Sequence, residues 1–147
     1  MEKLMNLVSS WQMVFVMIAM VGALGGCSRA TPIQAMPAVS YPGVTMADME
    51  AAIYDGCVRL GWTPVTEKNG VVKATLHLRK HVAIVNITFT QDQFAINYVD
   101  STNLKHKISK SGVESIHKNY NSWVQNLKKQ IMISLATQAK KNKTSMH

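Results

Sequence analysis

The middle of the chain carries the period-two alternation of β-strands. Every second residue from Val72 to Leu78 is apolar, and residues 94–99 alternate in the same way, which is typical of strands with one buried face. Residues 82–90 are apolar on both faces, which favours a central strand. With a further strand at 62–67, the pattern predicts four strands.

Short polar segments separate these strands. Asn69-Gly70 supplies the positive φ angles of a tight hairpin, residues 79–81 suit a second turn, and residues 90–93 suit a third. Because connections this short join neighbouring strands, we predict an antiparallel meander.

A helix is predicted on each side of the strands. Thr45 and Asp48 form a capping box and Gly61 can end the first helix. Ser111 and Glu114 repeat the capping pattern before the last helix. Apolar residues recur every three or four positions in both segments, at Met46, Met49, Ile53, Cys57 and Leu60, and at Val113, Ile116, Tyr120, Trp123, Leu127, Ile131 and Leu135.

These elements predict an α+β fold with the order α-β-β-β-β-α. A four-stranded antiparallel meander would form one layer, and both helices would pack on one face of it as a two-layer sandwich.

The first 26 residues have the features of a secretory signal peptide. Lys3 precedes an apolar run from Trp11 to Leu24, which is short for a membrane span. Leu24-Gly25-Gly26-Cys27 follows and resembles the lipobox of bacterial lipoproteins. The resemblance implies cleavage before Cys27, with acylation of its sulfur and of the new amino group, and two or more acyl chains anchor a protein stably in a bilayer.

The lipobox predicts the location of the chain as well as its anchor. Ser28 stands where Asp favours inner-membrane retention in the Gram-negative sorting pattern. We therefore expect a cell-envelope lipoprotein at the periplasmic face of the outer membrane rather than at the inner membrane.

Composition divides the rest of the chain into three parts. Residues 27–43 contain Pro32, Pro37 and Pro42, which predict an extended tether that lets the domain stand off the bilayer. Residues 44–140 form one small α+β periplasmic domain, and residues 141–147 form a basic tail.

The formal net charge is +8. This excess favours an anionic partner, such as lipid headgroups or lipopolysaccharide, although it also suits a merely soluble surface. Export argues against nucleic acid. The candidate binding residues occupy two loops, and separate loops are slightly favoured because the meander does not fix where residues 101–111 run: Arg79, Lys80, His81, Lys105, His106 and Lys107.

The other polar residues form no recognisable catalytic or metal motif. His77 and His81 are four residues apart, but this spacing matters for zinc on a helix rather than at a strand end and turn. Cys57 lies on the apolar stripe of the first helix, which favours a buried, inert thiol. We expect no metal and no cofactor.

Much of the folded part is similar to short, uncharacterised proteobacterial lipoproteins. The resemblance implies an envelope location and a small α+β module, and it brings no activity or catalytic residue. It depends on four segments: GWTPV (61–65), LRKHVAIVNITF (78–89), INYVDSTNL (96–104) and IHKNYNSWVQNL (116–127).

Three hypotheses for function follow. The first is a non-enzymatic, membrane-anchored module that binds an anionic envelope component or a protein partner. The second is an enzyme that acts on cell-wall or lipid substrates. The third is a structural subunit of an envelope complex, which an exposed apolar patch on the uncovered sheet face would favour.

Overall fold

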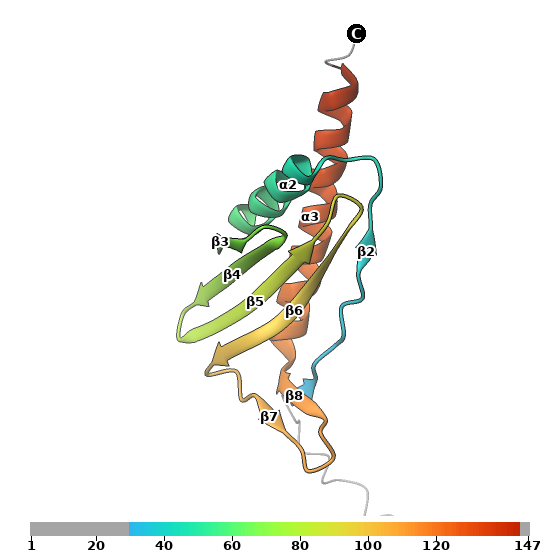
Figure 1. Cartoon of the computed structure of the whole chain (residues 1–147). Coiled ribbons are helices and arrows are strands. Elements are labelled where there is room, and N and C mark those ends of the chain that lie inside the picture. The colour runs from blue at the N-terminus through green and yellow to red at the C-terminus, as the bar shows by residue number, and fades with distance from the viewer. Residues whose placement is uncertain (1–29, 145–147) are drawn as a thin grey trace, which may run out of the picture.

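The computed structural model describes residues 30–144, so the signal peptide and Cys27 lie outside the described residues. Within this range the fold is α+β. The elements in chain order are β1 Ala30–Pro32, β2 Val39–Ser40, α2 Met46–Arg59, β3 Trp62–Lys68, β4 Val71–Leu78, β5 His81–Phe89, β6 Gln93–Thr102, β7 Lys107–Ile108, β8 Glu114–His117 and α3 Lys118–Thr144 (Figure 1).

The strands form two antiparallel sheets. The larger sheet has the order β2-β6-β5-β4-β3 and the smaller has the order β1-β8-β7. The predicted meander is present as β3 to β6, but it is part of a five-stranded sheet because β2 pairs with the start of β6. The predicted single four-stranded sheet and the predicted order α-β-β-β-β-α were therefore wrong, because β1 and β2 precede α2, and β7 and β8 lie between β6 and α3.

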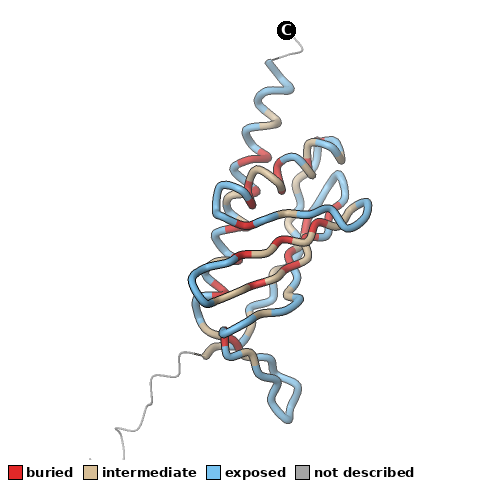
Figure 2. Tube along the Cα trace, turned by 90° about the vertical axis from the view of Figure 1, so that its left-hand side faces the viewer, coloured by how far each residue is buried: buried red, intermediate tan, exposed pale blue. Residues whose placement is uncertain are grey.

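Both helices cover one face of the larger sheet and leave the other open (Figure 1). Burial alternates along the central strands accordingly (Figure 2). Val72, Ala74 and Leu76 of β4 are buried beneath the helices, whereas Lys73 and Thr75 between them are only partly buried. The core lies between the sheet and the apolar stripes of α2 and α3, as the period-two and helical patterns predict.

The two helices pack antiparallel at very short distance. A Cβ added to Gly56 of α2 would lie 2.8 Å from Cγ1 of Ile131 and 3.0 Å from its backbone Cα. Close by, the Ser134 hydroxyl of α3 donates a hydrogen bond of 2.6 Å to the Asp55 carboxylate. Only a residue without a side chain lets the helices approach this closely.

The α2 caps are confirmed, but the predicted start of the last helix is wrong. Thr45 and Asp48 form both hydrogen bonds of a capping box. Glu114, by contrast, lies in β8, and α3 begins only at Lys118. The Ser111-x-x-Glu114 pattern belongs to a turn in which Gly112 has a φ of +82° and reverses the chain so that β7 pairs with β8.

The segment before α2 is extended, as its prolines predict, but from residue 30 onward it is not a free tether. β1 pairs with β8 and β2 pairs with β6, and four side chains pack against the core: Ile33, Met36, Val39 and Tyr41. Pro32 lies in an edge strand, where its missing N–H costs no ladder hydrogen bond. The prolines therefore belong to a docked segment that contributes one short edge strand to each sheet.

Asn121 of α3 holds this N-terminal segment in place. Its amide nitrogen donates hydrogen bonds to the Thr31 hydroxyl and to the Pro32 carbonyl, at 3.0 and 2.9 Å. Its amide oxygen accepts a bond of 3.1 Å from the Gln34 backbone. Asn121 is 7% exposed, so its polar atoms are matched by partners that only this docked position supplies.

Gly56→Ala should destabilise the fold although alanine favours helix. The added methyl group meets Ile131, including its backbone, so we expect the free energy of unfolding to fall by about 1–3 kcal/mol in urea denaturation. Ala51→Gly, at an exposed position of the same helix, measures the effect of helix propensity alone and should lower the free energy of unfolding by about 1 kcal/mol. A stabilised Gly56→Ala variant would show that the helices are not in contact here.

Asp55→Asn should remove a pH-dependent part of the stability. The hydrogen bond from Arg59 and then the hydrogen bond from Ser134 hold the pKa of Asp55 below its ordinary value. Because the folded pKa is lowered, the charged form stabilises the fold above the unfolded pKa, and this contribution is lost as the pH falls through the folded pKa. We expect a difference from wild type of about 1 kcal/mol at pH 7, which begins to shrink near the ordinary Asp pKa of about 4 and is gone once the pH lies below the lowered folded pKa.

Asp92→Asn is the matched control for this series. Asp92 lies in a turn, and its carboxylate has no hydrogen bond or ion pair to any of residues 30–144. The free energy of unfolding of Asp92→Asn, plotted against pH, should run parallel to that of the wild type. A difference for Asp55→Asn that persists unchanged at pH 3 would contradict the assignment.

Candidate anion-binding surface

The two basic loops lie side by side at one end of the larger sheet. The ring nitrogen Nδ1 of His81 donates a hydrogen bond of 3.0 Å to the carbonyl of Asn103. The Asn103 amide in turn donates one of 2.6 Å to the carbonyl of Lys80. The expectation that the loops are separate is wrong, because pairing of β5 with β6 extends to Val82 and Thr102 and brings the loops together.

We call this surface the basic end. It lies at the lower end of the domain in Figure 1, where β4 meets β5 and where the chain leaves β6 for β7. It comprises the candidate residues Arg79, Lys80, His81, Lys105, His106 and Lys107.

The backbone of the basic end is held in an unusual conformation. Arg79, Asn103 and Lys105 have φ angles of +55°, +59° and +54°, and they are the non-glycine residues with positive φ within residues 30–144. This region costs an L-residue about 1–2 kcal/mol and is tolerated best by glycine and asparagine. Two cations thus occupy positions where glycine would be less strained, and strain of this kind is typical of functional surfaces.

The cationic side chains are not neutralised by their surroundings. Arg79, Lys80, Lys105 and Lys107 are exposed, and their side chains form no hydrogen bond or ion pair with the part of the chain that the structure describes. A group of unpaired cations at one end produces a positive field that attracts anions.

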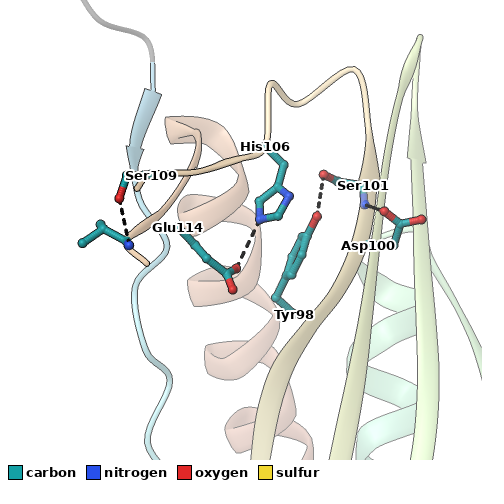
Figure 3. Close-up of polar contacts among 7 residues, drawn as sticks. Tyr98, Asp100, Ser101, His106, Ser109 and Glu114 are labelled. Carbon is teal, nitrogen blue, oxygen red and sulfur yellow. Dashed lines mark hydrogen bonds and ion pairs between the residues drawn. The ribbon is translucent and has the colours of Figure 1, made fainter. Parts of the chain in front are cut away.

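His106 differs from the four exposed cations because its ring is turned inward (Figure 3). The ring centroid lies 4.7 Å from that of Tyr98, and Nε2 lies 3.2 Å from a carboxylate oxygen of Glu114. The Tyr98 hydroxyl hydrogen-bonds to Ser101 at 3.0 Å, and burial is the main cause that raises the pKa of Tyr98. His106 therefore fixes the loop between β6 and β8 and positions the exposed lysines on each side of it.

His81 is half-buried on the helix side of the sheet. Its ring lies 6.3 Å from the ring of His117 and 6.4 Å from that of Trp123. His77 pairs with Val82 while Leu78 pairs with His81, so His77 and His81 face opposite sides of the sheet. Their four-residue spacing does not bring them together, and residues 30–144 contain no group of three metal-ligating side chains.

Apart from Glu114 beside His106, most carboxylates of residues 30–144 lie far from the basic end. Asp48, Glu50 and Asp55 lie along α2, whereas Glu67 and Asp92 lie at the end of the sheet opposite the basic end. The Ser101 hydroxyl bonds to Tyr98 rather than to His106, so these residues do not form a nucleophile–base pair. Cys57 is buried, and burial raises the pKa of its thiol to about 12, which disfavours the reactive thiolate.

A small apolar cavity of about 130 Å³ lies beside the basic end. Leu78, which directly precedes Arg79, lines it together with Trp62 and Trp123. The sequence pattern predicts strands at Trp62 and Leu78 and a helical apolar stripe at Trp123. It does not predict the cavity, because alternation shows which residues face the helices but not where their packing leaves a gap.

Comparison with known proteins adds no family to this description. No protein-family model, curated protein or solved structure matches the chain. Among the described helices, none has the length and apolar character needed to cross a membrane.

Proposed function

We propose that this protein is a lipid-anchored module of the cell envelope that binds an anionic envelope component through its basic end, without catalysing a reaction. The observation that carries the proposal is the convergence of two cationic loops around Asn103. Phosphate-bearing lipids and lipopolysaccharide have the chemistry that such a surface recognises.

The lipobox supports the anchor. Leu24-Gly25-Gly26-Cys27 follows an apolar segment of signal-peptide length, and acylation of Cys27 would hold the module at a bilayer outside the cytoplasm. Ser28 supports sorting to the periplasmic face of the outer membrane.

The open face of the larger sheet gives less support to a structural subunit. Val65 and Val99 are exposed there, by 55% and 45%. Polar residues lie between them on the same face. Lys73 pairs with Val65 across β3 and β4, and Asn97 lies in β6, two residues before Val99. A mixed face of this kind lacks the contiguous apolar patch that a permanent interface requires.

Metabolic labelling tests the anchor. When the full chain is produced in a Gram-negative host supplied with radiolabelled palmitate, the protein should carry the label and fractionate with membranes. Cys27→Ala should abolish the label, because the thiol is the acceptor. A labelled Cys27→Ala variant, or an unlabelled wild type with its first methionine intact, would overturn the proposed anchor.

The double variant Arg79→Gly and Lys105→Gly tests the binding surface. Glycine relieves the positive φ at both positions, so the free energy of unfolding should stay unchanged or rise by up to about 1 kcal/mol. With the full chain held in neutral-detergent micelles through its anchor, binding of a short-chain, water-soluble phosphatidylglycerol to the basic end should weaken roughly 20- to 30-fold, since each cation near an anionic surface contributes about five-fold.

The control removes two charges from the opposite end of the molecule. Lys140→Gln and Lys143→Gln lie in the last turns of α3 and are exposed, so they lower the net charge equally. Binding should change less than for the glycine pair. Equal losses in both variants would mean that only the net charge matters and that the basic end is no specific site.

A further inference from the structure

We infer that the basic end and the β7–β8 hairpin dock on the anionic phospholipid surface of the bilayer that holds the anchor, with Ile108 and Val113 entering its headgroup region. The inference rests on the proposed function and names the partner for the same surface. It depends on three observations: where the chain enters the domain, what the hairpin exposes, and how charge is distributed.

The chain enters the domain at the basic end. Ala30 pairs with His117 at the start of β1, and the blue first strand lies next to β8 at the lower end of the domain (Figure 1). Only Ser28 and Arg29 lie between Cys27 and Ala30, which limits the Cα–Cα separation of Cys27 and Ala30 to about 10 Å. An acylated Cys27 would therefore keep this end of the domain against the bilayer.

The β7–β8 hairpin extends beyond the rest of the domain at this end and is exposed over most of its length (Figure 2). Ile108 and Val113 are 63% and 52% exposed, and Lys107 and Lys110 stand beside them in the sequence. Apolar side chains flanked by lysines are the combination that binds the interface of an anionic bilayer.

The hairpin is held in shape by its own hydrogen bonds. The Val113 backbone donates to the Ser109 hydroxyl at 3.0 Å (Figure 3), and the Ser109 backbone donates to the Val113 carbonyl at 2.9 Å. Gly112 also donates to the Ser109 carbonyl. The exposed apolar residues are thus presented on a preformed turn, so little ordering cost accompanies binding.

Charge favours the same orientation. The β5–β6 turn with Asp92 lies at the far end of the sheet, where β2 pairs with β6. Asp48 bonds to Asn142 near the end of α3, also far from the hairpin. Docking through the basic end thus keeps these carboxylates away from anionic headgroups while the unpaired cations face them. Glu114 lies in the hairpin itself, opposite Ile108, and its carboxylate is paired with His106.

The test compares an environment-sensitive dye at two exposed isoleucines. Ile108→Cys places the dye on the hairpin, and Ile133→Cys places it on α3, where the native side chain is 58% exposed and lies about 22 Å further along the helix than Lys118. The full chain is extracted from membranes, labelled and reconstituted in vesicles of phosphatidylcholine with or without phosphatidylglycerol. Cys57 is buried and does not react in the folded protein.

In vesicles with phosphatidylglycerol, the dye at position 108 should shift to shorter emission wavelengths and be quenched by lipids brominated near the headgroup. The dye at position 133 should show neither effect. Lys107→Gln and Lys110→Gln should each weaken the docked state roughly five-fold, and high salt should release it.

The experiment distinguishes failure of the proposed docking from failure of the proposed anchor. A water-exposed dye at position 108 in anionic vesicles, with the protein still acylated, overturns the docking and leaves the anchor intact. Labelling of the native wild-type chain at Cys27, together with loss of vesicle association, overturns the anchor. Identical spectra at positions 108 and 133 show that the domain has no fixed orientation, which also overturns the inference.

Discussion

The close approach of α2 and α3 at Gly56 is the constraint on which the rest of the structure depends. Because the helices meet almost backbone to backbone, they form one closely packed layer on one face of the sheet. This packing fixes α3, and α3 carries Asn121, which holds the N-terminal segment, and follows directly from β8. The position of the basic end relative to the entry of the chain therefore follows from the helix pair.

Stability and the candidate surface place opposite demands on the chain. The helix side is closely packed and its polar groups are paired, as Asp55 with Ser134 and Asn121 with Pro32 show. At the basic end, Arg79 and Lys105 remain in a strained backbone conformation with unpaired side chains. His106 and Asn103 offset this strain by bonding the loops to Glu114 and Lys80. The backbone strain at the basic end thus lowers the stability of the fold, and these neighbouring contacts hold the loops in place.

Local patterns were sufficient for the elements whose structure is determined locally. The Thr45 capping box and the alternation of β4 predict α2 and the meander correctly. The second capping pattern failed because Ser-x-x-Glu also suits a turn, and Gly112 decides in favour of the turn. The docked N-terminal segment and the convergence of the basic loops depend on contacts between residues far apart in sequence, such as Thr31 with Asn121. A close helix approach likewise leaves no trace at Gly56 except its small size.

The short distance from Cys27 to the first strand has a consequence for affinity. With Cys27 acylated as proposed, the first strand would be confined within about 10 Å of a bilayer and would meet headgroups at an effective concentration in the millimolar range or above. Contacts that are too weak to detect between separate molecules are then largely occupied. With Cys27 anchored as proposed, release of β1 and of the residues that Asn121 holds would lengthen the linker to the 11 residues before β2, residues 28–38, and would dilute the same contacts. The pairing of β1 with β8 and the hydrogen bonds of Asn121 would then together control how often the domain reaches the bilayer.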